Sequence, residues 1–155
     1  MTDAPIQPIA RNKKAYHDYQ ILDKWEAGIA LRGTEVKSLR DGKVQMGDSY
    51  ARIEDGEAYL VGLHISPYGR AATEDHEPTR KRKLLLHRRE IKRLGTKVNE
   101  RGLTLVPLRL YFRRGIAKVE LGLVRGKRQY DKRREIKKRE HKRQMARAMS
   151  QKRRP

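Results

Sequence analysis

Cysteine is absent from the 155 residues, which excludes disulfides, thiolate nucleophiles and cysteine-ligated zinc sites. Long apolar runs are missing too, because the longest aliphatic stretches, residues 29–31 and 84–86, have three residues each. A membrane-spanning helix needs about 20 such residues. The first residues carry no apolar signal-peptide core, so we expect no export. These absences favour a protein of the reducing cytoplasm.

Motifs of the common enzyme classes are lacking as well. The chain has no P-loop, no dinucleotide-binding fingerprint and no G-x-S-x-G nucleophile motif. No pair of histidines has the helical spacing of a zinc-protease site, so we expect them to be satisfied or solvent-facing side chains. The five histidines are His17, His64, His76, His87 and His141. We therefore expect no catalysis, no cofactor and no bound metal, with a basic nuclease or RNA-modifying enzyme as the enzymatic alternative.

Acidic residues are few beside basic ones. The 39 Lys and Arg against 19 Asp and Glu give a net charge of +20 and an isoelectric point near 10.6. Such a field attracts phosphate polymers or anionic membranes. The C-terminal part lacks the Trp, Phe and Leu face of an interfacial helix, and the chain lacks a DNA-reading helix-turn-helix, zinc-finger or zipper pattern. RNA, recognised by shape, phosphates and stacking, is the expected partner.

Charge is densest in residues 126–155, which carry fourteen Lys or Arg against three acids. Their apolar residues, Tyr130, Ile136, Met145 and Met149, are too sparse to make a core. Such a segment cannot bury enough apolar surface to offset its ordering entropy, so alone it should be disordered or nascent helix. We expect three regions: a flexible arm over 1–14, a globular part over 15–125, and this basic tail over 126–155.

The globular part alternates apolar and polar residues in several short segments, which is typical of strands. Asp55-Gly56 and Arg114-Gly115 are hairpin turns, and the phase slip at Val106-Pro107 indicates a bulge or an edge position. The expected strands are 15–22, 29–32, 49–53, 58–65, 103–112 and 117–124, and the expected helices are 35–40, 83–94 and a short one after Thr96. This pattern predicts a mainly β fold with small helices, an antiparallel barrel of the OB-fold type.

Two clusters are candidates for RNA contact. Tyr16, His17 and Tyr19 could stack bases on a barrel face, or could simply pack within the fold. Basic residues lie before and along the expected 83–94 helix, where they form either a surface that contacts RNA or a solvated helix face. These are Arg80, Lys81, Arg82, Lys83, Arg88 and Arg89.

Six ordered blocks of the chain resemble the small protein B family, the SsrA-binding proteins of bacteria. The resemblance runs from about residue 12 into the tail and leaves residues 1–11 and roughly 144–155 unmatched. The blocks are NKKAYHDYQI (12–21), EAGIALRGTEVKSLRDGK (26–43), DSYARIEDGEAYL (48–60), HISPY (64–68), DHEPTRKRKLLLHRREI (75–91) and GKRQYDKR (126–133).

The resemblance implies an OB-like barrel that binds the tRNA-like domain of transfer-messenger RNA (tmRNA, or SsrA RNA) and travels with it to stalled ribosomes. Elongation factor Tu and alanyl-tRNA synthetase would be involved indirectly, through the RNA. The tail would enter the empty mRNA channel near the decoding centre, contact ribosomal RNA and fold there as a helix. A general RNA chaperone or ribosome-associated basic protein without a rescue role is the alternative.

The family's RNA-binding residues map here onto Asn12, His17, Tyr19, Glu35 and Lys37, with Lys83 and Lys127 as basic support, and Arg40 beside Lys37 on one helix face. A carboxylate is unusual in an RNA site. Glu35 either accepts from base or ribose donors, or orients Lys37 and neighbouring amides. The implied ribosome-contacting tail residues are Tyr130, Asp131, Lys132, Arg133, Ile136, Lys137, Lys138 and Arg139.

The chain departs from the family pattern at two places. Tyr130 stands where many members carry His, so stacking on a decoding-centre base is kept and a positive charge is not. Residues 44–47 read Val-Gln-Met-Gly, where the family more usually has Asn followed by an aliphatic residue.

Overall fold

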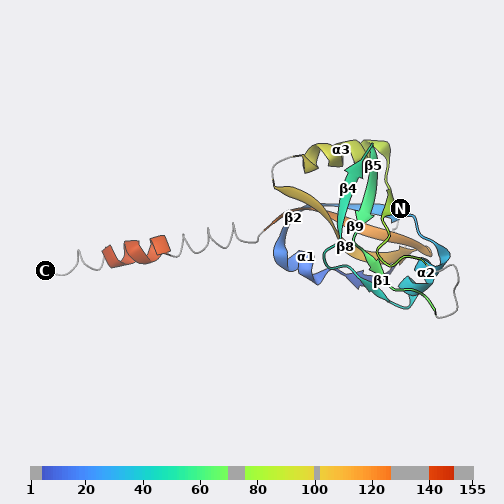
Figure 1. Ribbon diagram of the computed structural model, residues 1–155. Coiled ribbons are helices and arrows are strands. Elements are labelled where there is room, and N and C mark those ends of the chain that lie inside the picture. Colours follow the sequence, from blue (N-terminus) through green and yellow to red (C-terminus); the bar gives the residue numbers. More distant parts are fainter. Residues whose placement is uncertain (1–4, 70–75, 100–101, 127–139, 149–155) are drawn as a thin grey trace. The chain divides into compact units, whose positions relative to one another are not determined.

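The computed structural model describes residues 5–69, 76–99, 102–126 and 140–148. Contacts divide the chain into two compact units, Met1–Arg125 and Gly126–Pro155. In the second unit, residues 140–148 form a helix whose residues are all exposed, drawn in red in Figure 1.

The first unit is mostly β structure with three short helices among its described residues (Figure 1). The elements follow one another as β1 (Ile6–Arg11), α1 (Lys13–Asp18), β2 (Tyr19–Ile29), α2 (Gly33–Arg40), β3 (Val44–Gln45), β4 (Tyr50–Glu54), β5 (Glu57–Val61), β6 (His64–Ile65), β7 (Arg82–Leu85), α3 (Arg88–Val98), β8 (Leu103–Arg113) and β9 (Ile116–Gly126).

Strand pairing closes the main sheet on itself. The order is β1-β8-β4-β5-β7-β2-β9, and β8 also pairs with β9, so six strands form a ring and β1 adds to β8 from outside it. The registers β1–β8, β2–β7, β4–β5, β4–β8, β5–β7 and β8–β9 are all antiparallel. Closure removes the exposed edges of the strands in the ring. The predicted fold class, a mainly β barrel of OB type with small helices, is confirmed.

Both predicted hairpin turns are present. Asp55 and Gly56 have φ angles of 50° and 76°, and Arg114 and Gly115 have 53° and 73°. Two consecutive positive φ angles make the tight turn whose twist matches paired strands. The first turn joins β4 to β5 and the second joins β8 to β9.

The predicted irregularity in β8 is also confirmed, and it sets which side chains enter which core. The register with β9 shifts between Pro107 and Arg109. Before the shift, Leu105 faces the main core; after it, Leu110 does. Leu108 instead joins a second cluster that packs against α1, with Val106, Val124 and Ala15. A bulge turns the strand so that one strand serves two cores.

The N-terminal region differs from its prediction. Ile6–Arg11 is a strand paired with β8 rather than a flexible arm. Lys13–Asp18 is a helix rather than the start of a strand, because Asn12 caps it: its side-chain oxygen accepts from the Ala15 backbone N–H at 3.1 Å. The expected 29–32 strand is wrong as well, since β2 ends at Ile29.

The region 82–98 also differs from its prediction. Arg82–Leu85 is a strand that alternates inward and outward, pairing with β5 and β2. The helix α3 starts later, at Arg88, and continues through Gly95 to Val98. Gly95 is tolerated inside it because an added Cβ would meet only Ile53, at 3.7 Å. Leucines 84–86 fit a helical stripe or a buried strand equally well, and the vacant sheet edge between β5 and β2 decides for the strand.

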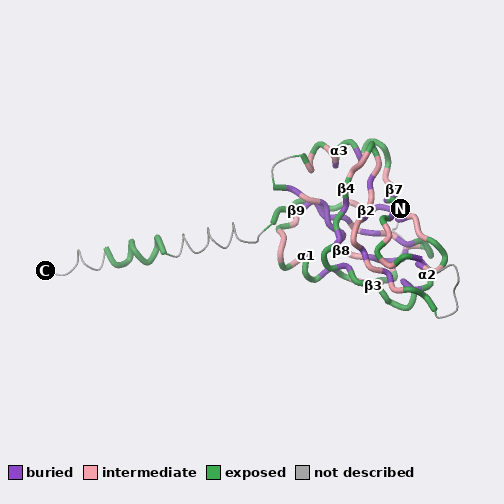
Figure 2. The backbone as a smooth tube through the Cα atoms, in the orientation of Figure 1, coloured by how far each residue is buried: buried purple, intermediate pink, exposed green. Residues whose placement is uncertain are grey.

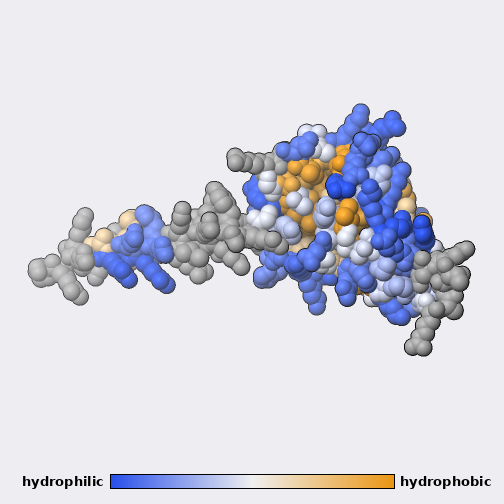
Figure 3. All heavy atoms as spheres, in the orientation of Figure 1, coloured by the Kyte–Doolittle hydropathy of each residue, from blue (hydrophilic) through white to orange (hydrophobic). Residues whose placement is uncertain are grey.

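The core lies inside the ring of strands, as the purple segments of Figure 2 show. Leu60, Leu63, Ile65, Leu94, Val119 and Leu121 are all fully buried. Figure 3 shows apolar atoms in the middle of the visible face and hydrophilic residues around them. Among the described residues, no helix is long and apolar enough to span a membrane.

Candidate nucleic-acid interface

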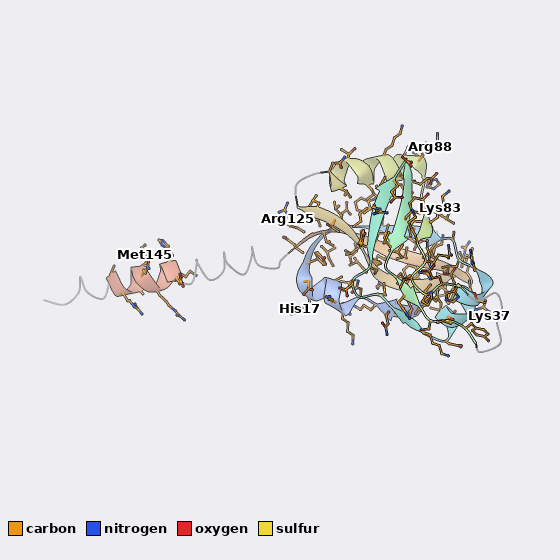
Figure 4. All side chains as sticks on the ribbon, viewed as in Figure 1. His17, Lys37, Lys83, Arg88, Arg125 and Met145 are labelled. Carbon is orange, nitrogen blue, oxygen red and sulfur yellow. The ribbon has the colours of Figure 1, made fainter. Side chains whose placement is uncertain are left out.

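The sequence-predicted RNA-binding residues do not gather into one site. His17, Lys37, Arg40 and Lys83 are exposed, Tyr19 is half-buried, and Asn12 and Glu35 are buried. Figure 4 shows His17, Lys37 and Lys83 on different parts of the first unit, on α1, α2 and β7. Any RNA that touched all of them would therefore have to wrap around the barrel.

Asn12 is a structural anchor. It is 5% exposed, and besides capping α1 its Nδ2 donates to the carbonyl of Pro107 at 2.8 Å. Its backbone N–H donates to the carbonyl of Leu108 at 2.8 Å. The Asn12 side chain thus links α1 to the bulge in β8, and both ends of its amide group are hydrogen-bonded to the protein backbone. In this structure Asn12 fixes the position of α1, and its direct contact with RNA stays a prediction.

Glu35 is likewise enclosed by the protein, with no solvent exposure. Its carboxylate accepts from the Arg32 backbone N–H at 2.8 Å, from Arg80 Nη2 at 2.5 Å and from Arg82 Nε at 2.5 Å. Of the two roles considered from sequence, these contacts fit the orienting role, and contact of Glu35 with RNA stays a prediction. Glu35 orients the backbone amide and two arginines, and Lys37 is not among its contacts.

The charge balance at Glu35 favours its ionised form. Burial alone would raise the pKa of the carboxyl, but hydrogen bonds from Arg80, the Arg32 backbone and Arg82 outweigh it, so the pKa lies below its ordinary value. Arg82 is fully buried, and its Nη1 donates to the Leu63 carbonyl at 2.6 Å. This network joins α2 to β7 and explains why both charges are tolerated inside the fold.

His17 and Tyr19 lie at the junction of α1 and β2. The His17 side chain is 80% exposed, and its Nδ1 lies 2.9 Å from the Asp18 carboxylate. Tyr19 packs partly against the cluster that contains Val124, close to where β9 ends. Tyr19 therefore packs within the fold, as the packing alternative predicts, whereas His17 is exposed and its stacking on RNA stays a prediction.

Lys37 and Arg40 lie on the exposed face of α2. The Lys37 ammonium is 5.3 Å from the centre of the Tyr68 ring, which is itself 42% exposed. Arg40 borders a cavity of about 630 Å³ lined also by Ile9, Leu39 and Phe112. Basic and aromatic side chains therefore stand together here, on a part of the unit separate from His17.

A groove beside β7 was not foreseen from sequence. Its volume is about 650 Å³, and its lining includes Lys83, Leu85, His87, Glu26 and Lys118. We call it the β7 groove. Leu85 is 54% exposed, which is unusual for a leucine among charged residues of both signs. Gly28 allows β2 to run beside it, since a Cβ there would come within 3.1 Å of the Leu85 Cβ.

A second cleft lies between β1, α1, β2 and β8. Its volume is about 580 Å³, and Arg11, Tyr16, Lys24, Arg109 and Tyr111 are among its lining residues. We call it the Arg11 cleft. The Arg11 guanidinium lies 4.4 Å from the centre of the Tyr16 ring. Among these residues, sequence reasoning singled out Tyr16 alone, because the pairing of β1 with β8 that builds the cleft was not predicted.

Comparison with known proteins identifies the family. The family model described as SmpB protein matches residues 9–151. The SsrA-binding protein of Syntrophobacter fumaroxidans is 59% identical over 145 residues, covering 94% of this chain and 90% of that protein. The SsrA-binding protein of Carboxydothermus hydrogenoformans is 60% identical over 141 residues, covering 91% of this chain and 95% of that protein.

This chain belongs to the SmpB family. A solved structure described as "tmRNA-SmpB: a journey to the center of the bacterial ribosome" is similar in fold as well as sequence. Its TM-score is 0.69 at 59% identity, and the match covers 87% of this chain and 93% of the other. The resemblance recognised in the six sequence blocks is thereby confirmed.

The remaining predicted residues of this SmpB-family chain lie outside the described part. They are Lys127, Tyr130, Asp131, Lys132, Arg133, Ile136, Lys137, Lys138 and Arg139. Apart from Lys83 and Tyr16, the lining residues of the two grooves were not predicted: Leu85 fitted the stripe of the expected 83–94 helix, and Lys118 fitted an ordinary strand position. Within the described ranges, no three His, Asp or Glu side chains are grouped to hold a metal ion.

Proposed function

We propose that this chain is an RNA-binding adaptor: it binds SsrA RNA, that is tmRNA, and brings it to stalled bacterial ribosomes for trans-translation. The observation that carries the proposal is near full-length similarity to proteins named SsrA-binding protein and to a tmRNA-SmpB structure. The net charge of +20 supports it, because an adaptor between two RNAs must attract phosphate at more than one surface.

The tRNA-like part of the RNA is held by the barrel, and the β7 groove is the surface best suited to it. Lys118 and Lys83 can each contact a phosphate, although the Lys83 ammonium lies 3.5 Å from the Glu57 carboxylate and would have to exchange that partner for the RNA; His87 supplies a stacking face. Leu85 offers an exposed apolar contact for a ribose or base face. Glu26 also lines the groove, and its carboxylate can accept from exocyclic amines or ribose hydroxyls.

The other predicted surfaces act at the periphery of this contact. His17 stacks or pairs with RNA at the end of α1, and Lys37 with Arg40 bind phosphates along α2. Asn12 and Glu35 support these surfaces from inside, by holding α1 and α2 in place. The exposure of His17, Lys37 and Arg40 supports their roles as direct contacts.

The basic tail supplies a contact conditional on an empty mRNA channel. Ordering the tail costs conformational entropy, which only a vacant phosphate-lined groove would offset. A message already in the channel would occupy the same volume and carry the same charge as its walls. Two contacts on one body raise the effective concentration of each. Elongation factor Tu and alanyl-tRNA synthetase meet the protein only through the RNA, in the cytoplasm, and the protein itself performs no catalysis.

A binding competition tests the proposal. The dissociation constant is measured for the tRNA-like domain of SsrA RNA and for a shuffled RNA of equal length, at matched salt. We expect a preference for the tRNA-like domain that persists when salt is raised, whereas tail contacts weaken by about 0.7 log unit per neutralised phosphate per log unit of salt. Equal affinity for both RNAs would favour the general chaperone instead.

Paired variants then locate the contact. Leu85→Ala and Lys83→Ala should each weaken binding of the tRNA-like domain several-fold, because they remove an apolar and a phosphate contact from the β7 groove. Ile116→Ala and Lys92→Ala are the matched controls, since Ile116 is 59% exposed and Lys92 is an exposed lysine of α3. Equal effects of variants and controls would remove the β7 groove from the interface.

A further inference from the structure

The charged residues that line the Arg11 cleft, Arg11, Lys24 and Arg109, are all basic. Two acids adjoin it: Glu120 accepts from Arg109 at 2.8 Å and lies 3.7 Å from the Lys24 ammonium, and Glu26 accepts from the Tyr111 hydroxyl. Within the part of the chain that the structure describes, Arg11 has no acidic partner. Its guanidinium is exposed and lies over Tyr16 instead. The cleft therefore offers a net positive charge beside an aromatic face.

The geometry at Arg11 suits a nucleobase. A guanidinium lying over a tyrosine ring is a flat, cationic platform, and bases stack both on aromatic rings and on arginine planes. Lys24, 5.9 Å from the same ring, is placed for the phosphate of a nucleotide stacked there. An apolar protein segment would have to desolvate Arg11 without a compensating anion, which is unfavourable. Charge complementarity thus selects a nucleic acid.

The back of the cleft is rigid. Tyr111 is 3% exposed, and its hydroxyl donates to Glu26 at 2.5 Å. The guanidinium of Arg113 lies 3.3 Å from the same carboxylate and 5.7 Å from the Tyr111 ring. This wall behind the Arg11–Tyr16 platform loses little freedom when a ligand binds, which lowers the entropic cost of binding.

The cleft continues towards the β7 groove. Glu26 lines that groove and bonds Tyr111 of the cleft, and Lys118, also of the groove, is the register partner of Tyr111 on β9. Lys24 of the cleft and Glu26 of the groove also belong to the same strand, β2. A strand of RNA leaving the β7 groove can therefore reach the Arg11 cleft without leaving the surface.

We propose that the Arg11 cleft is a second RNA subsite, which takes one unstacked nucleotide with its base on the Arg11–Tyr16 platform and its phosphate at Lys24. The inference extends the proposed function, because it assigns a further segment of the same bound RNA to this surface. It differs from a bulk phosphate contact in that it requires a base, and in that its loss leaves the basic tail unchanged.

Photo-crosslinking with a 4-thiouridine pentamer tests the subsite on the full-length protein, and mass spectrometry of the digested adduct identifies the attached residue. We expect an adduct at Tyr16 in addition to adducts on the tail. Arg11→Ala should reduce the cleft adduct about tenfold and leave the tail adducts as an internal reference. Arg93→Ala is the matched control, because it removes an exposed arginine from α3 and should change neither.

The outcomes separate this inference from the proposed function. Adducts confined to the tail or to other surfaces, or a cleft adduct insensitive to Arg11→Ala, would overturn the subsite. The pentamer contains no tRNA-like structure, so the result stands whether or not SsrA RNA is preferred over shuffled RNA. Circular dichroism of Arg11→Ala confirms that an exposed side chain was removed without loss of the fold.

Discussion

Glu35 and Arg82 are fully buried and in contact with each other, and this pair dominates the energetics of single residues in the barrel. Neither charge could be buried alone, since an isolated ion loses several kcal/mol of solvation. Further hydrogen bonds replace the lost solvation: Glu35 accepts from Arg80 and the Arg32 backbone, and Arg82 donates to the Leu63 carbonyl. The family resemblance implies an RNA-binding role for Glu35, and its burial adds a role in the fold that the sequence did not predict.

Glu35→Ala is predicted to destabilise the barrel by about 3–5 kcal/mol, because Arg82 would remain buried without a counter-charge. Urea unfolding followed by circular dichroism measures the change. Glu90→Ala is the matched control: Glu90 has the same capping-box position in α3 and accepts from the His87 backbone N–H at 3.1 Å, but is partly solvated. Its loss should cost about 1 kcal/mol. Similar costs for both would contradict the buried-pair account.

Acid should weaken the fold through the same residue. The folded-state pKa of Glu35 is lowered from its ordinary 4.5, so its contribution to stability is complete above that value and is lost as the pH falls through the lower one. Urea midpoints from about pH 6 to about pH 3 should therefore fall more steeply for the native protein than for Glu35→Gln. Other carboxylates titrate in both proteins, so a parallel decline would show that Glu35 contributes nothing to the acid sensitivity.

At the scale of elements, features set by neighbouring residues, such as turns and the β8 bulge, were predictable from sequence, and the pairing of distant strands was not. The Asp55-Gly56 and Arg114-Gly115 turns depend on residues that tolerate positive φ, and the β8 bulge on a proline that cannot donate. The strands β1 and β7 depend on vacant edges supplied by distant segments. A single sequence does not show which sheet edges are vacant, and so the predictions of a flexible arm over 1–14 and of a helix over 83–94 were wrong.

The same limit explains the site. Basic and aromatic residue types were recognisable, but their exposure depends on which strands meet. Leu85 is exposed and Asn12 buried for reasons of tertiary structure alone. The Arg11 cleft exists only because β1 pairs with β8, and the β7 groove only because β7 replaces the start of the expected helix.

Gly122→Ala should disturb the bulge that feeds both cores. A Cβ at Gly122 would lie 2.7 Å from Leu108 Cδ1 and 2.9 Å from its Cγ, and Leu108 is fully buried, so it has little room to move. We expect destabilisation of about 1–3 kcal/mol by overpacking, measured by urea unfolding. Gly33→Ala is the control, since nothing lies within 4 Å of its added Cβ, and it should be nearly neutral. A neutral Gly122→Ala would show that β8 can shift at the bulge.

At the scale of the whole molecule, the hydrophobic core separates a folded RNA-binding unit from a basic tail, because the core ends before the tail begins. Every residue of the two hydrophobic clusters lies between Ala15 and Val124, so the first unit contains the complete described core. The last thirty residues hold fourteen of the 39 basic residues. In the second unit, the described helix 140–148 is exposed throughout, and a helix of that length is marginal in isolation. We infer that its stability is supplied by a polyanionic surface.

Truncation after Arg125 tests that division. The barrel should fold with an unchanged circular dichroism signal in its β region and should keep nearly the full preference for the tRNA-like domain, because the β7 groove lies within the first unit. Activity on ribosomes stalled at the end of a truncated message should be lost. A full-length variant with the tail residues in scrambled order keeps the charge of +11 and separates charge from sequence. If this variant restores activity, the tail acts as a simple polycation; if the truncated barrel loses its RNA preference, the two-part division is wrong.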